Sequence, residues 1–138
     1  MAGQQSKQKP FFYSYSIKWD ANNNGGNIAN NATAAGTFNV LNIGNFVLQQ
    51  LIASVYTAAG ALVASPLAFV QLTDTTSSNV LFDQTTPILN LFGTAQLPYV
   101  LPYPRILRGN ATIQASVTNN TGAAAAVYLT FAGQMVPL

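Results

Sequence analysis

The side chains that could carry acid–base or metal chemistry are few and far apart in this sequence. There is no His, Cys or Glu, and the carboxylates are Asp20, Asp74 and Asp83. General acid–base catalysis relies mostly on His and on carboxylates, and a Ser or Thr hydroxyl becomes a nucleophile only beside a base. Zinc sites need His or Cys, and no acidic loop of the EF-hand type is present. We therefore expect no enzyme, no cofactor and no metal site.

Asp74 and Asp83 are the two carboxylates that a turn could bring together. A pair about 5–9.5 Å apart could hydrolyse a glycosidic bond, and with backbone carbonyls the same pair could bind calcium. We favour the simpler interpretation that both are solvated residues near the ends of a hairpin.

Two of the five cations, Arg105 and Arg108, flank Ile106 and Leu107 after a proline-rich approach. Proline restricts its own backbone and favours an extended conformation in the residue before it. We expect a stiff, exposed strap from which both arginines project toward a partner. The alternatives are that they only increase solubility or pair with Asp74 or Asp83. The residues predicted to contact a partner are Lys7, Lys9, Phe12, Tyr99, Tyr103, Arg105 and Arg108.

The composition combines many apolar residues with very little charge. Apolar residues make up 49% and aromatic residues 11%, which is too many for a disordered chain. Charged residues make up only 6%, against about a quarter in average soluble domains. Free monomers usually stay soluble through interspersed charge. The composition therefore favours a folded domain that is docked permanently in an assembly.

Neither nucleic acid nor membrane is a predicted partner. The cations are scattered, whereas nucleic-acid binders carry a patch or stripe of Lys and Arg. Residues 51–70 are apolar and about as long as a bilayer span, but Ser, Thr, Gly and Pro interrupt them and no cations flank them. The polar first ten residues do not resemble a signal peptide.

Alternating apolar and polar residues predict an all-β chain. Residues 11–19 have aromatic and aliphatic side chains at every second position, which indicates a strand. Residues 111–118 and 126–136 alternate on either side of an Asn/Gly turn and predict a hairpin. With further strands at 38–43, 45–57, 67–74 and 80–84, a hairpin turn at Gly60 and an extended segment after Pro87, the count is about eight or nine strands and no helix. This pattern is typical of a β-sandwich or barrel.

The expected organisation is one domain preceded by an arm. Residues 1–10 are predicted to be a flexible N-terminal arm, and residues 11–138 a single β-sandwich domain. Residues 20–37 are rich in Asn and Gly and predict a long loop. Three Asn-X-Thr triplets begin at Asn31, Asn110 and Asn119, and we interpret these asparagines as turn residues.

The segments "NLFGTAQ", "LPYPRILRG" and "VYLTFAG" occur in an order that resembles small structural proteins of tailed bacteriophages. The resemblance spans residues 46–133 and is strongest to cement or decoration proteins of podovirus-type heads. It implies a jelly-roll-like β-sandwich without enzymatic activity. It also implies binding to the outside of the major capsid protein lattice as a dimer or trimer, on the exterior of a virion assembled in the host cytoplasm.

Two other functions fit the same features. A carbohydrate-binding or receptor-binding module would need an exposed aromatic platform with Asp or Asn nearby, since jelly rolls also serve as lectins. A head–tail or tail accessory protein would share the composition and the fold, and would differ from a cement protein only in its place in the particle.

Overall fold

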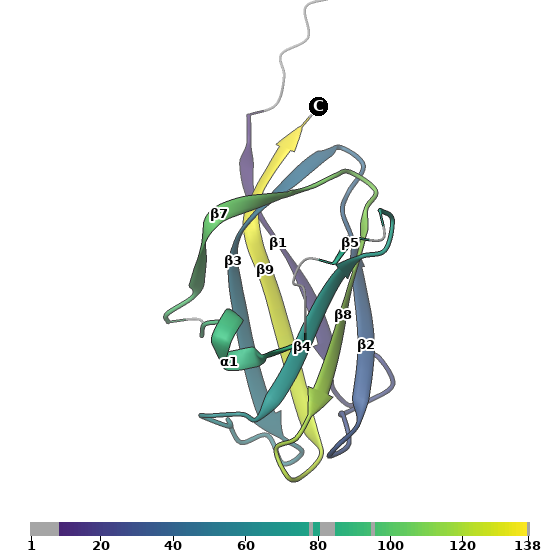
Figure 1. The fold of residues 1–138 in the computed structure, drawn as a ribbon, viewed down its shortest axis with the longest axis vertical. Coiled ribbons are helices and arrows are strands. Elements are labelled where there is room, and N and C mark those ends of the chain that lie inside the picture. The colour runs from purple at the N-terminus through teal and green to yellow at the C-terminus, as the bar shows by residue number, and fades with distance from the viewer. Residues whose placement is uncertain (1–8, 78, 81–84, 95, 138) are drawn as a thin grey trace, which may run out of the picture.

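Two antiparallel β-sheets packed face to face form the body of the protein (Figure 1). The computed structural model describes residues 9–77, 79–80, 85–94 and 96–137. The first sheet has the order β1-β9-β3-β7. Its strands are β1 (Phe11–Trp19), β9 (Ala125–Pro137), β3 (Gly44–Thr57) and β7 (Tyr99–Leu107).

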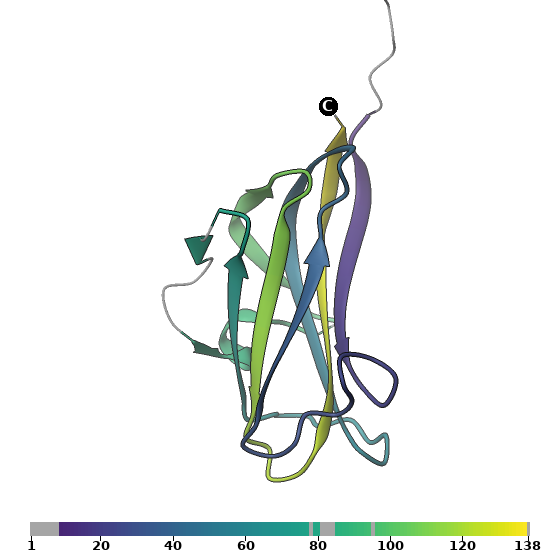
Figure 2. The same ribbon diagram turned by 90° about the vertical axis from the view of Figure 1, so that its right-hand side faces the viewer.

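The second sheet has the order β2-β8-β4-β5, and β6 also pairs with β4. Its strands are β2 (Thr33–Asn39), β8 (Thr112–Asn119), β4 (Ala68–Asp74), β5 (Asn79–Val80) and β6 (Thr86–Pro87). A one-turn helix, α1 (Ile88–Leu91), follows β6. Figure 2 shows the two layers from the side.

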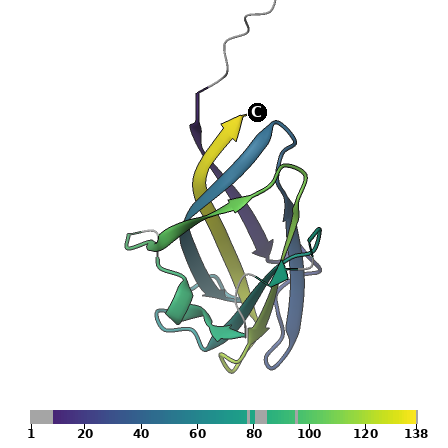
Figure 3. The ribbon, with the colours of Figure 1, turned by 45° about the horizontal axis from the view of Figure 1, so that its top comes forward.

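The strand pairing is that of a jelly roll. β1 pairs with β9, β2 with β8, β3 with β7 and β4 with β5, so the chain folds back on itself as one long antiparallel double strand that is then rolled into two sheets. Figure 3 shows the chain crossing between the layers at both ends. The predicted all-β, jelly-roll-like sandwich is confirmed, with nine strands in the described residues, two-residue strands included.

Alternation along each long strand places one set of side chains in the core between the sheets. In β1, Ile17 and Trp19 are fully buried, whereas Phe11 at the other end is 36% exposed. The Trp19 indole donates a hydrogen bond to the Ala35 carbonyl oxygen at 3.2 Å. A Cβ atom on Gly36 would come within 3.0 Å of the Trp19 ring, so the missing side chain lets β2 lie over it. The aromatic row of β1 is therefore mainly core.

The predicted C-terminal hairpin is wrong. β8 and β9 alternate as expected, but they belong to different sheets and do not pair with each other. Both strands have buried apolar residues at alternate positions because each faces the core from its own side. Alternation shows which face of a strand is buried; it does not show which strand is its neighbour.

Three local predictions also need correction. The loop predicted over 20–37 ends earlier, because β2 begins at Thr33. The turn at Gly60 closes only a short hairpin, in which Tyr56 bridges Leu62, and the chain then crosses to β4 in the other sheet. Pro87 is followed by α1 rather than by an extended segment. The strand predicted over 80–84 lies mostly outside the described residues.

Residues 51–70 form the end of β3, the Gly60 turn and the start of β4. In the part of the chain that the structure describes, no helix has the length and apolar composition needed to cross a membrane. Two of the three Asn-X-Thr asparagines, Asn31 and Asn110, have positive φ angles of 63° and 67°. Asparagine tolerates this backbone conformation better than most residues, which confirms that these two are turn residues.

Asn119 is the buried polar residue that ties the loops together at one end of the sandwich. Its side-chain amide donates to the carbonyl oxygens of Ile28 and Ala123, both at 2.8 Å. Its side-chain oxygen accepts from the Thr121 backbone N–H at 2.9 Å and from the Thr121 hydroxyl at 2.7 Å. The side chain is fully buried and all its hydrogen-bonding positions are used, so it connects the loop before β2 to the β8–β9 turn.

Replacing Asn119 with Ala removes these four hydrogen bonds from a fully buried position, while the Ile28 and Ala123 carbonyl oxygens keep the Ala125 N–H and the Thr121 hydroxyl as donors. A typical intramolecular hydrogen bond contributes about 0.5–1.5 kcal/mol net, so we expect the loss of four such bonds in Asn119→Ala to lower the free energy of unfolding by roughly 3 kcal/mol in urea titrations. Asn120→Ala is the matched control, because Asn120 makes one exposed side-chain bond to Asn31. Equal losses in the two variants would contradict the role given to Asn119.

Candidate functional site

The outer faces of the two sheets differ in chemistry. On the second sheet, the outward side chains of β2, β8 and β4 are mostly neutral and polar, with Thr33 beside Thr118 and Thr37 beside Gln114. On the first sheet, the outward rows also contain Ser, Thr and Gln side chains, with Lys18 as the charged residue across β1, β9 and β3, and large apolar residues stand among them. The first sheet therefore differs from the second mainly in the large apolar side chains that it exposes at one end, Phe12 and Ile106 among them.

Exposed apolar side chains gather at one end of that face. In register across the sheet, Phe12 lies beside Gln134, Gln134 beside Val47, and Val47 beside Ile106. Phe12 is 72% exposed and Ile106 67% exposed. β7 is the edge strand, and its apolar residues Val100, Pro102, Pro104 and Ile106 are all exposed. We call this patch the apolar rim; its members are Phe12, Val47, Val100, Pro102, Pro104 and Ile106.

The residues predicted to contact a partner lie at several places. Phe12 is in the apolar rim, and Tyr103 is 84% exposed on β7. Tyr99 is half-buried against the core, so little of it is open to a partner. Lys9 is exposed just before β1, and Lys7 lies outside the described residues. Their contact with a partner stays a prediction.

Arg105 and Arg108 do not project as a pair. Arg105 lines an open hollow of about 270 Å³ between the two sheets, with Tyr103 and the core residues Leu48 and Leu72. Arg108 is exposed beyond the end of β7, after the buried Leu107. The strap is extended and exposed as expected, but its two arginines lie at different places: Arg105 at the hollow and Arg108 beyond the end of β7.

The carboxylate pair predicted near a turn is only half described, since Asp83 lies outside the described residues. The Asp74 carboxylate accepts hydrogen bonds from the backbone N–H groups of Thr76 at 3.0 Å and Ser77 at 3.3 Å. It therefore caps the turn that follows β4. Within the described ranges, no group of three or more His, Cys, Asp or Glu side chains is placed to hold a metal ion.

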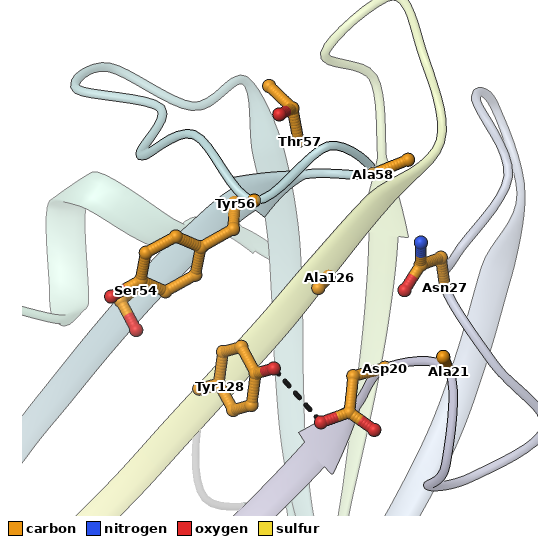
Figure 4. A pocket seen from close by; sticks show the side chains of 10 residues that line it. Asp20, Ala21, Asn27, Ser54, Tyr56, Thr57, Ala58, Ala126 and Tyr128 are labelled. Atoms are coloured by element: carbon orange, nitrogen blue, oxygen red, sulfur yellow. Dashed lines mark hydrogen bonds between the residues drawn. The ribbon is translucent and has the colours of Figure 1, made fainter.

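A cleft that the sequence did not reveal lies on the first sheet, at the end opposite the apolar rim (Figure 4). Its volume is about 540 Å³. Tyr56 from β3 and Tyr128 from β9 lie side by side, with ring centroids 5.6 Å apart and an interplanar angle of 80°. Asp20, just beyond β1, accepts a hydrogen bond from the Tyr128 hydroxyl at 2.9 Å. We call this site the tyrosine cleft.

Hydrogen bonds keep the Asp20 carboxylate ionised. The Asn23 side-chain amide donates to it at 2.7 Å and the Asn22 backbone N–H at 3.0 Å. These two bonds, the Tyr128 hydroxyl and the positive charge of Lys18 lower the pKa of Asp20 below its usual 3.8. The same contact raises the pKa of the Tyr128 hydroxyl, because its proton is held by the carboxylate.

Sequence reasoning missed the tyrosine cleft because Asp20 and Tyr128 are 108 residues apart. One signal was present. In the alternating strand that contains Val127 and Leu129, Tyr128 occupies the outward position, where small or polar residues were expected. A large aromatic residue in the outward phase of a strand is a reason to look for a surface site.

The described residues thus form a jelly-roll β-sandwich with an apolar rim and a tyrosine cleft. No family model matches this chain, and no curated protein matches it. Among solved structures, the chain is similar to the VP2 subviral particle of infectious bursal disease virus, with a TM-score of 0.36 and 8% identity. The match covers 98% of this chain and 39% of that chain, so the present chain spans less than half its length. The resemblance to tailed-phage cement proteins stays a prediction.

The hydrogen bond in the tyrosine cleft has a measurable effect on titration. Replacing Tyr128 with Phe removes one donor to the carboxylate, so we expect the pKa of Asp20 to rise toward 3.8. Carbon-detected NMR of the Asp20 carboxyl would follow the change.

Because folding lowers the pKa of Asp20, this carboxylate stabilises the folded state at neutral pH and stabilises it less as the solution becomes acidic. The Asp20 contribution is fully present above the pKa of the unfolded chain and is lost as pH falls through the lower pKa of the folded state. Ser54→Ala, on the same face, is the control and should leave the Asp20 titration unchanged. An unchanged titration in Tyr128→Phe would refute the proposed coupling.

Proposed function

We propose that this protein is a virion structural protein, a cement or decoration protein that binds the outside of a tailed-phage head. One observation carries the proposal: the apolar rim exposes several large apolar side chains on a domain with only 6% charged residues. Monomeric soluble proteins rarely leave such patches in water, and contiguous exposed apolar surface marks interaction sites. The resemblance of residues 46–133 to phage cement proteins supplies the kind of partner.

The prolines of β7 determine how the rim would bind. An exposed edge strand can extend its sheet by pairing with a strand of another chain. Pro102 and Pro104 have no backbone N–H to donate, so the edge is a poor template for such pairing. Contact through packed side chains is favoured instead, with Phe12, Val100 and Ile106 buried against the shell.

The mechanical role follows from many identical contacts. A head that is filled with DNA is under outward pressure, and a subunit that touches two neighbouring capsomers adds binding energy across their joint. Association of the subunits as a dimer or trimer would join several weak contacts into one stronger attachment. This function needs no catalytic residue, in keeping with the scarcity of acid–base side chains in the sequence.

The proposal is tested by placing a charge in the rim. Ile106→Asp puts a carboxylate where the partner would remove water, so we expect its affinity for empty heads assembled from the cognate major capsid protein to fall at least about tenfold. Co-sedimentation of purified chain with those heads measures the affinity.

Thr37→Asp is the matched control, because Thr37 is also exposed, faces outward and lies on the edge strand β2. It should bind as the wild type does. If the wild-type chain fails to sediment with heads, the proposed function is wrong; if it binds and Ile106→Asp binds equally well, the rim is not the contact. Binding to tails alone would favour a tail accessory protein.

A further inference from the structure

The tyrosine cleft contains polar groups that the protein itself does not use. Ser54 and Tyr56 from β3 and Asn27 from the loop after β1 line the hollow with Asp20 and Tyr128. Within the part of the chain that the structure describes, the side chains of Ser54, Tyr56 and Asn27 take part in no hydrogen bond. In Figure 4, side chains from three separate segments face this hollow.

The Asp20 carboxylate also keeps acceptor capacity. An ionised carboxylate has about four lone-pair positions. Asn22 and Asn23 occupy Oδ1, and the Tyr128 hydroxyl occupies one position on Oδ2. Among the described residues no second donor reaches Oδ2, so one of its positions is open to a ligand, and the Tyr128 hydroxyl oxygen can itself still accept a hydrogen bond.

We propose that the tyrosine cleft binds a neutral sugar ring. A pyranose has an apolar face of C–H groups that can pack on a tyrosine ring, and hydroxyls that both donate and accept hydrogen bonds. The unused hydroxyl and amide groups match such a ligand, and the open position on Oδ2 accepts one of its hydroxyls. The volume of about 540 Å³ lies in the usual range for small-molecule sites, roughly 300–1,000 Å³.

The charges around the cleft favour a neutral ligand over a cationic one. An acidic group beside aromatic rings could also hold an ammonium or guanidinium group. However, Lys18 lies directly beside Tyr128 in the sheet and acts electrostatically on Asp20. Its positive charge offsets that of the carboxylate and opposes a cation in the cleft.

The tyrosine cleft and the apolar rim are separate sites, so sugar binding in the cleft does not depend on capsid binding at the rim. Gln134 in the row of the apolar rim and Tyr128 in the cleft are six residues apart on β9 (134 − 128). At about 3.4 Å per residue the two sites lie roughly 20 Å apart along the strand. A partner docked on the rim would therefore leave the cleft open.

The test uses the whole 138-residue chain and defined probes. Methyl glycosides of glucose, galactose, mannose and N-acetylglucosamine are titrated separately while amide shifts are followed by NMR. We expect saturable shifts at Ser54, Tyr56 and Tyr128 for at least one sugar. Tyr56→Ala should weaken that binding at least about tenfold, whereas Tyr56→Phe, which keeps the ring, should retain most of it.

Tyr103→Ala is the control, because Tyr103 is a highly exposed tyrosine far from the cleft on the edge strand. Tyr103→Ala should bind the sugar as the wild type does. For Tyr56→Ala, an NMR spectrum that is unchanged away from the cleft shows that this variant is folded. No saturable shift with any of the four sugars, or equal binding by Tyr56→Ala, would overturn the proposal. Shifts with tetramethylammonium but with no sugar would identify a cation site instead.

Discussion

The structure depends on β9, which pairs with β1 on one side and with β3 on the other along nearly its whole length. Its inward residues Val127, Leu129 and Phe131 have no exposed surface, and each large apolar side chain buried in this way contributes roughly 1.5–3 kcal/mol. Because β9 lies between β1 and β3, it also determines which side chains are neighbours on the outer face of the sheet. The outward side chains of β9 from Tyr128 to Gln134 lie in register with neighbours on β1 and β3. This register places Phe12 beside Gln134, and it brings Asp20, just beyond β1, within hydrogen-bonding distance of Tyr128.

Because only 6% of the residues are charged, the surface of the protein must be hydrated mainly by neutral polar side chains. The second sheet meets water through Thr and Gln side chains, whose hydroxyl and amide groups can be hydrated without formal charge. The first sheet lacks this compensation at the apolar rim, where Phe12 and Ile106 remain mostly exposed. Removing water from the large apolar side chains of the rim therefore costs less than removing it from the Thr and Gln side chains of the second sheet.

The sequence was sufficient to predict the fold class, because alternation in segments such as 11–19 and 112–118 reports directly on burial. It was insufficient for the pairing of strands. β8 and β9 look like a hairpin in the sequence, yet they face each other across the core, and only long-range packing decides between these arrangements. The tyrosine cleft was hidden for a similar reason, since its three main residues come from strands or strand ends that are distant in the chain. Turn chemistry was more local, and the positive φ angles of Asn31 and Asn110 agree with what their residue type allows.

The two sites on the first sheet differ in how they would bind. At the rim, apolar side chains would contribute to binding by leaving water. This contribution depends on the area buried and not on direction, so each side chain would add little specificity. In the cleft, the Asp20 carboxylate is already fixed by Asn22, Asn23 and Tyr128, so a ligand would meet oriented polar groups and lose little free energy in ordering them. Attachment at one end of the strands and recognition at the other can then evolve separately, because a substitution at Ile106 does not touch any group that positions Asp20.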